Sequence, residues 1–333
     1  MQIRLESSAH KGCVAVAGEQ GQSEGFDANP LPVVPVLFAC DLTYLQHACA
    51  CIASLLHNSP NYRFDVTIVG TEDFSEVSKK VYASFAKNPR IRLKFHNFQL
   101  PSDIFFPLHF HYTSETYIRF WIGEILASHS RALYLDPDVV TTGDIAPLWE
   151  TDLGGRTIAA VPIPASTRPE QHGMPPGSLF FNAGVILFDL DAWRAKDYGR
   201  VCLNYLSEHP EKALDSDQDI LNLCLMNDWV ALPYVWNVIS AFYFPSWHDT
   251  KLPPAELAAI QRQARIIHYN GGAKPWSVDS RHPRKDEYWK YLRMTAWRSA
   301  RPSDFTVMRA VKRAAADVLP MTLKSRIKTL MRV

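Results

Sequence analysis

The chain has few cysteines, no long apolar run and almost no net charge, and each of these absences narrows its class. Six cysteines among 333 residues, with no Cys-x-x-Cys pair, make neither a disulfide framework nor a zinc cluster, and they fit a reducing compartment. No stretch approaches about 18 apolar residues, and the first 32 residues lack the charged start and apolar core of a secretory signal. We therefore expect a cytoplasmic protein without a membrane-spanning helix.

Charge is balanced over the whole chain but not along it. The net charge is +1, whereas residues 301–333 hold eight Lys or Arg against two Asp or Glu, which leaves the first 300 residues at −5. A nearly neutral body argues against a nucleic-acid partner, so none is expected. The sequence also lacks internal repeats of about 20–50 residues, which excludes solenoids and propellers.

The composition, with 47% hydrophobic residues, is ordinary for a globular protein that buries a core. Residues 1–32 are rich in Gly, Ser, Glu and Gln and are predicted to be a poorly ordered extension outside the fold. Beyond them, strand-like runs (Val33–Cys40, Phe64–Val69, Ile91–Phe95, Arg131–Leu135, Thr157–Val161 and Val185–Leu190) alternate with segments of helical spacing (Leu45–Leu56, Ser75–Ala86, Tyr117–Ala127 and Asp217–Leu225). This alternation predicts a mostly parallel sheet covered by helices, with ligands at the carboxyl ends of strands.

Asp136-Pro137-Asp138 follows one of these apolar strands, so two carboxylates are expected at one edge of the sheet. Oxygen ligands of this kind suit a hard divalent cation that a substrate's phosphates complete. Pro137 favours an extended backbone at Asp136. Taken alone, however, Asp-Pro-Asp is more often a turn than a metal site, because Asp and Pro are common turn residues.

A second segment, Ile266–Trp276, combines His268, Gly271 and Lys274. A histidine can bind a transition metal, a glycine lets the backbone approach phosphates closely, and a lysine adds positive charge for a diphosphate leaving group. For each residue taken singly, a glycine turn, a core histidine or a solvated lysine explains the sequence at least as well.

Together the two segments, Leu-Tyr-Leu-Asp136-Pro-Asp138 and His268-Tyr-x-Gly271-x-x-Lys274-Pro-Trp276, resemble glycosyltransferase family 8. That family includes glycogenin and the lipopolysaccharide galactosyl- and glucosyltransferases. Four more blocks stand in the family's order: Ala39-Cys40-Asp41-Leu-Thr-Tyr44, Tyr117-Ile-Arg119-Phe120, Phe181-Asn182-Ala183-Gly184-Val185 and Asp217-Gln218-Asp219-Ile220-Leu221-Asn222. The resemblance covers residues 33–280, which would form the catalytic domain.

The resemblance implies a GT-A type nucleotide-diphospho-sugar transferase fold, an αβα sandwich with a mixed, mostly parallel sheet. It also implies retaining transfer of a hexose, galactose or glucose, from a UDP-sugar to a saccharide or lipid-linked saccharide acceptor such as a lipopolysaccharide or oligosaccharide core. The implied cofactor is Mn²⁺, with Mg²⁺ as a possible substitute.

By position, the resemblance makes Asp136, Asp138 and His268 the metal ligands. The implied substrate-binding residues are Asp41, Thr43, Arg119, Asn182, Ala183, Gly271 and Lys274. Thr43 stands where the lipopolysaccharide enzymes often carry Asn. The implied catalytic residues are Gln218 and Asp217, and which of them serves retention stays open, since an amide oxygen is a poor nucleophile and the neighbouring carboxylate is its competitor.

Residues 281–333 are predicted to form a basic, partly helical tail. From residue 306 onward, Leu323, Ile327 and Leu330 share one helical face, and Lys324, Lys328 and Arg332 share the adjoining face. Such a helix is typical of attachment to an anionic surface, here the inner face of the cytoplasmic membrane. Docking of this helix on its own domain or on a partner is the alternative.

Two other classes share single features with this chain. Haloacid-dehalogenase-like phosphatases also carry Asp-x-Asp after an apolar strand, but near the start of the domain, and they leave the segment around His268 unexplained. A non-catalytic nucleotide-sugar-binding protein would tolerate the loss of Asp138 or His268, and both are present.

Overall fold

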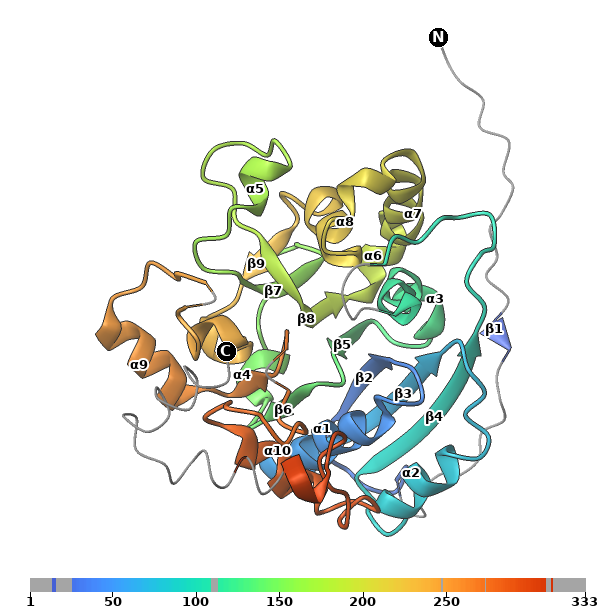
Figure 1. Cartoon of the computed structure of the whole chain (residues 1–333). Coiled ribbons are helices and arrows are strands. Elements are labelled where there is room, and N and C mark those ends of the chain that lie inside the picture. The colour runs from blue at the N-terminus through green and yellow to red at the C-terminus, as the bar shows by residue number, and fades with distance from the viewer. Residues whose placement is uncertain are drawn as a thin grey trace, which may run out of the picture.

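The computed structural model describes residues 14–15, 26–108, 113–246, 248–272, 274–309 and 313. Its centre is a mixed sheet of eight strands in the order β1-β4-β3-β2-β5-β8-β7-β9 (Figure 1). The strands are β1 (Val14–Ala15), β2 (Val33–Ala39), β3 (Arg63–Gly70), β4 (Ile91–Phe98), β5 (Arg131–Leu135), β7 (Ile158–Pro162), β8 (Phe181–Asp189) and β9 (Trp229–Ala231). Strands β2 to β5 run parallel, whereas β8 runs antiparallel to both of its neighbours.

Helices cover both faces of this sheet. Successive side chains of a strand point to opposite faces, and here both faces are apolar and must be buried. In β2, Val34 and Val36 enter one apolar core and Leu37 and Ala39 enter the other. The first core contains α1 (Leu45–Asn58), α2 (Ser78–Phe85), α9 (Pro254–Gln263) and α10 (Lys285–Leu292), and the second contains η1 (Ser114–Trp121), α3 (Ile122–Ile125), α6 (Leu190–Ala195), α7 (Tyr198–Glu208) and α8 (Asp217–Cys224). Figure 1 shows these two groups on opposite sides of the strands. The predicted αβα sandwich is confirmed.

A small second sheet pairs β6 (Val139–Thr141) with β10 (Ile266–His268) in antiparallel register. Short elements make up the remaining connections: α4 (Ala146–Trp149), α5 (Arg168–Gln171), η2 (Pro210–Lys212), η3 (Tyr234–Trp236) and η4 (Ser240–Phe242). The β6–β10 pair joins segments more than a hundred residues apart, and it matters for the site described below.

Two predicted elements differ from the structure in form. The single helix expected over Tyr117–Ala127 is instead the 3₁₀ helix η1 followed by the short α3. Tertiary contacts hold η1 in this tighter form, since Glu115 accepts from the Thr71 hydroxyl and Arg119 donates to the Ala183 carbonyl. Strand β8 also begins at Phe181, four residues before the predicted strand, so the Asn182-Ala183-Gly184 block lies within the sheet.

Parts of both terminal segments belong to the fold, although the sequence suggested otherwise for residues 1–32. Strand β1 pairs with β4, and the Phe26 side chain, 2% exposed, lies under the guanidinium groups of Arg63 and Arg92. In the predicted tail, α10 packs on α1. The amphipathic helix expected beyond residue 306 falls largely on residues 310–312 and 314–333, which lie outside the described part of the chain. Within that part, no helix is both long and apolar enough to span a membrane.

Candidate active site

A cavity of about 550 Å³ opens where the carboxyl ends of β2 and β5 meet the start of α8. Eleven of the twelve predicted site residues line it, and only Thr43 does not. The position agrees with the rule that ligands of an open α/β sheet bind beyond the carboxyl ends of its strands. Residues predicted from six separate sequence blocks therefore share one cavity.

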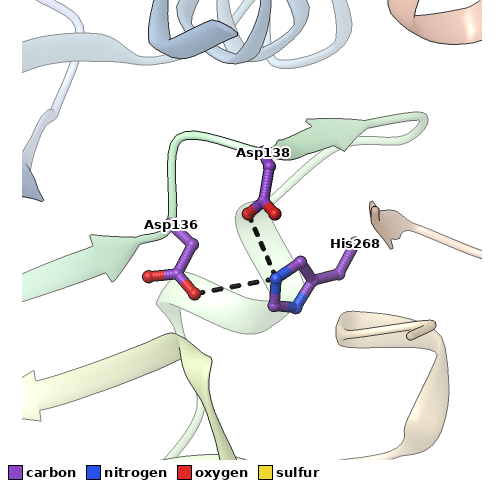
Figure 2. Close-up of side chains that lie close together, drawn as sticks. All are labelled: Asp136, Asp138 and His268. Carbon is purple, nitrogen blue, oxygen red and sulfur yellow. Dashed lines mark ion pairs between the residues drawn. The ribbon is translucent and has the colours of Figure 1, made fainter. Parts of the chain in front are cut away.

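Three metal-binding side chains converge in this cavity. One ligand atom from each of Asp136, Asp138 and His268 lies within 4.8 Å of the other two. The His268 Nε2 atom is 3.6 Å from an Asp136 oxygen and 3.2 Å from an Asp138 oxygen (Figure 2). The β6–β10 pairing explains this approach, because it places His268 opposite Val139 and lets the Tyr269 amide donate to the Asp138 carbonyl.

Gly184 provides the space in which these groups meet. The Asp136 amide donates to the Gly184 carbonyl at 2.8 Å, which ties the end of β5 to β8. A Cβ atom at Gly184 would lie 2.3 Å from His268 Cε1 and 2.6 Å from an Asp136 carboxylate oxygen. Any other residue here would therefore displace a ligand group, which explains the need for glycine.

The three side chains fit a divalent cation chemically. Two carboxylate oxygens and one imidazole nitrogen form a donor set that transition metals accept, and Asp138 and His268 are almost fully buried. The arrangement is thus a DxD-like candidate metal site.

Lys274 supplies a further positive charge at the edge of this site. Its ammonium group forms an ion pair with Asp138 and lies 5.8 Å from the centroid of the Tyr44 ring and 5.5 Å from that of Trp276. Burial by itself raises the pKa of Asp138, but the charges of Lys274 and His268 outweigh it and hold that pKa well below its usual range. We call Asp136, Asp138, His268 and Lys274 the charged face of the cavity.

Neutral carboxamides form another part of the site. The Gln218 Oε1 atom accepts hydrogen bonds from Asn182 Nδ2 at 2.9 Å and from the Ala183 amide at 3.0 Å, and Gln218 Nε2 donates to Asp215 at 2.7 Å. Asn182 Oδ1 in turn accepts from Asn237 Nδ2 at 2.7 Å. We call Asn182 and Gln218, together with Asn237, which supports Asn182 from outside the cavity lining, the amide face.

Arg119 lies beside both faces, since it pairs with Asp136 and donates to the carbonyl of Ala183, the residue after Asn182. Its guanidinium group, in a residue that is 3% exposed, is 3.2 Å from Asp136 and 2.8 Å from Asp217, and it lies over the ring of Tyr134. Burial raises the pKa of Asp217 to about 7, against the lowering effect of the Arg119 charge. A single buried cation therefore compensates two carboxylates from different parts of the site.

Asp41 lies at the end of β2, on the remaining side of the cavity. It accepts from the Thr43 hydroxyl at 2.7 Å and from the Tyr44 amide at 2.9 Å, and Tyr44 itself lines the cavity. Thr43 thus orients Asp41 and does not face the cavity. Gly271, which has a positive φ of 71°, turns the chain between His268 and Lys274.

Several residues of the site were not identified from the sequence, among them Tyr44, Glu115 and Asp215, which line the cavity, and Asn237, which does not line it but bonds to residues that do. Tyr44 and Asp215 flank predicted blocks, so their proximity was a usable signal. Asn237 offered none, because it stands between η3 and η4 without strand or helix periodicity. Its Oδ1 atom nevertheless accepts from His268 Nδ1 at 3.0 Å, which makes it the direct neighbour of a candidate metal ligand.

Comparisons with known proteins agree with this geometry. A family model described as glycosyl transferase family 8 matches residues 35–280. General stress protein A of Bacillus subtilis is 30% identical over 196 residues, which are 56% of this chain and 68% of that protein. The lipopolysaccharide 1,2-glucosyltransferase of Escherichia coli is 26% identical over 286 residues, 83% of this chain and 82% of that protein.

Solved structures show the same fold. The galactosyltransferase LgtC, solved with donor and acceptor sugar analogues, superposes with a TM-score of 0.68 at 24% identity and covers 80% of this chain and 99% of its own. The bifunctional glycosyltransferase WbbM gives a TM-score of 0.65 at 21% identity over 86% of this chain and 52% of its own. The comparisons give no support to a phosphatase or to a non-catalytic binding protein. The chain is a glycosyltransferase with the GT-A fold and belongs to glycosyl transferase family 8.

Proposed function

We propose that this protein transfers a hexose, galactose or glucose, from a UDP-sugar to a saccharide acceptor with retention of anomeric configuration, and that it uses Mn²⁺, or Mg²⁺ in its place. The observation that carries the proposal is the convergence of Asp136, Asp138 and His268 beside Lys274, in a cavity whose other side consists of oriented amides. A diphosphate and a neutral sugar require these two kinds of surface.

The charged face binds the diphosphate. When bound there, a divalent cation would neutralise charge that develops on the leaving UDP. Lys274 contributes a second positive charge, and the turn at Gly271 allows the backbone to approach the phosphates. Because the bound cation and Lys274 would together neutralise the leaving diphosphate, departure of UDP needs no strong general acid.

The nucleoside lies at the end of β2. Asp41, oriented by Thr43 and by the Tyr44 amide, accepts hydrogen bonds from the uracil or the ribose. The Tyr44 ring offers an apolar surface beside it. This arrangement gives Thr43 an indirect part in donor binding, through Asp41.

The hexose lies against Arg119, Asn182, Ala183 and Asp217, close to Gln218. Retention by double displacement needs a free nucleophile opposite the leaving group. The Gln218 oxygen already accepts two hydrogen bonds, and Asp217 forms an ion pair with Arg119. These engagements favour a mechanism in which both residues stabilise positive charge on the sugar and neither forms a covalent bond to it.

We further propose a lipopolysaccharide or oligosaccharide core as the acceptor, met at the inner face of the cytoplasmic membrane. The name of the Escherichia coli relative and the basic sequence beyond residue 306 support this proposal. Deleting residues 306–333 should reduce binding to vesicles that contain anionic lipid and leave transfer to a soluble acceptor intact. Equal vesicle binding by the truncated and full chains would show that this segment is not the anchor.

The test of the main proposal is a screen of UDP-sugars with Mn²⁺ that measures UDP release and transfer. We expect UDP-galactose or UDP-glucose to be consumed, and the Asp138→Ala variant or a chelator to reduce the rate by more than about 100-fold while the protein stays folded. Undiminished rates in chelator would refute the metal assignment. An NMR spectrum of the product's anomeric proton tests retention separately.

A further inference from the structure

A chain of hydrogen bonds connects the amide face to the candidate metal site. It runs from His268 Nδ1 to Asn237 Oδ1 at 3.0 Å, and from Asn237 Nδ2 to Asn182 Oδ1 at 2.7 Å. It continues from Asn182 Nδ2 to Gln218 Oε1 at 2.9 Å and ends where Gln218 Nε2 donates to Asp215 at 2.7 Å. We call these four linked contacts the amide relay.

Fixed groups determine the direction of every link in the amide relay. The Asp215 carboxylate can only accept, so the Gln218 amide nitrogen must face it. The backbone amides of Ala183 and Gly184 can only donate, so Gln218 Oε1 and Asn182 Oδ1 must face them, at 3.0 Å and 3.1 Å. With both of these carboxamides fixed, Asn237 must present Nδ2 to Asn182 and Oδ1 to His268.

This polarity also determines which tautomer a neutral His268 ring adopts. Since Asn237 Oδ1 accepts, His268 Nδ1 carries the hydrogen, and the lone pair of neutral His268 is on Nε2. Nε2 is the atom that faces Asp136 and Asp138. A histidine that binds metal through one nitrogen commonly donates from the other to a partner that holds its ring in place.

We propose that Asn237 is a positioning residue that couples two functions: it holds His268 in the metal-binding tautomer and, through Asn182, it fixes the carboxamide of Gln218 toward the sugar. The inference rests on the metal-dependent transfer proposed above. Asn237 does not line the cavity and is not one of the candidate metal ligands. It acts through its hydrogen bonds to His268 and Asn182.

The hydrogen bond to His268 and the hydrogen bond to Asn182 can be tested separately, because an aspartate at position 237 keeps only the first. Asn237→Asp still accepts from His268 but cannot donate to Asn182, and its charge would repel the Asn182 oxygen. Rotating the Asn182 carboxamide would not remove this repulsion at no cost. Its nitrogen would then face the Gly184 N–H, and its oxygen would face Gln218 Oε1. Asn237→Leu, of similar size, removes both hydrogen bonds.

The experiment measures Mn²⁺ affinity by calorimetry, with equal UDP in cell and syringe, together with kcat and thermal stability. Asn237→Leu should weaken Mn²⁺ binding by about 10–100-fold and lower kcat. Asn237→Asp should bind Mn²⁺ at least as tightly as the unmodified protein, yet lose about tenfold or more in kcat. Asn182→Asp, which keeps its acceptor for Asn237 and loses its donor to Gln218, should behave like Asn237→Asp.

Asn58 provides a matched control. Its side-chain nitrogen also lies at hydrogen-bond distance from buried polar groups, the carbonyls of Ser54 and Thr141 and the Tyr291 hydroxyl, and Asn58 does not line the cavity. Asn58→Leu should lower thermal stability without changing Mn²⁺ affinity or kcat. Unchanged Mn²⁺ affinity in Asn237→Leu, or parallel losses of affinity and kcat in Asn237→Asp, would overturn the inference. If the unmodified protein bound no Mn²⁺ with UDP, the metal assignment in the proposed function would fail with it.

Discussion

The charged face and the amide face of the cavity obtain their order in different ways. On the charged face, Asp136, Asp138 and His268 converge from a strand end and a two-stranded pair, and ion pairs link them to one another and to Lys274. On the amide face, Asn182, Gln218 and Asn237 carry no charge, and each is satisfied by its neighbours. Ion pairs between charged groups thus order one face, whereas hydrogen bonds between neutral groups order the other.

This difference suits the two parts of a sugar nucleotide. A diphosphate carries concentrated negative charge. A cation and a lysine attract this charge without requiring one precise orientation of the phosphate oxygens. Sugar hydroxyls differ only in direction, so a surface that distinguishes them must hold donors and acceptors in fixed orientations. Arg119 contacts both regions, through Asp136 on the charged face and through the Ala183 carbonyl beside Asn182 of the amide face.

The largest expected effect comes from breaking the charged face at Gly184. Gly184→Ala places a Cβ where His268 Cε1 and Asp136 now meet, so one ligand group must move away. We expect a loss of more than about 100-fold in Mn²⁺ affinity and in transfer rate. Gly154→Ala is the control, because a Cβ there meets open space, and its positive φ should cost only about 1 kcal/mol of stability. Tight Mn²⁺ binding by Gly184→Ala would contradict the geometry.

The charged face follows from the sequence to a greater extent than the amide face. Asp136 and Asp138 stand after an apolar strand, and a parallel sheet gathers such residues at one edge. Their neighbour His268 was identified through a resemblance, because pairing of β6 with β10 across more than a hundred residues leaves no local pattern. Asn237 could not be found at all, since an isolated asparagine in an irregular segment is common.

In the sheet, too, some features could be predicted from the sequence and others could not. Local apolar runs predicted six of its strands, because burial on both faces produces continuous hydrophobic sequence. The antiparallel insertion of β8 between β5 and β7 depends on long-range pairing that no single strand encodes. The 3₁₀ winding of η1 likewise follows from contacts of Glu115 and Arg119 with distant residues. Thr43 was expected to contact the donor, and in the structure its hydroxyl donates a local hydrogen bond to the Asp41 carboxylate.

A smaller effect is expected from removing the second cation of the charged face. Lys274→Met keeps most of the side chain's bulk and removes the lysine partner of Asp138, which keeps its contact with His268. Because a bound metal still neutralises much of the diphosphate, we expect kcat to fall by about 10–100-fold. Lys80→Met is the matched control, since that lysine also lies over an indole ring, Trp297 at 4.5 Å, but away from the cavity. An unchanged kcat in Lys274→Met would mean that Lys274 serves only to hold Asp138.

The smallest expected effect concerns Asp217, which lies between the two faces. Burial raises the pKa of its carboxyl group to about 7, above the value of about 3.9 expected in the unfolded chain. Folding therefore favours the protonated form, and the contribution of Asp217 to stability is greatest below about pH 4 and declines as the pH rises through 7. Asp217→Asn removes this titration, so its free energy of unfolding relative to the unmodified protein should rise by about 1 kcal/mol per pH unit between pH 5 and 7.

Asp65 provides the opposite case for comparison with Asp217. Burial alone raises the pKa of Asp65, but hydrogen bonds from His129 and Arg92 and the charge of Lys94 lower it overall. Its contribution is therefore present at neutral pH and is lost only as the pH falls below about 4, so Asp65→Asn should destabilise the protein by a constant amount from pH 5 to 8. Urea unfolding of both variants at four pH values separates the two behaviours. A flat difference for Asp217→Asn would mean that Arg119 keeps Asp217 ionised, and Asp217 would then belong to the charged face.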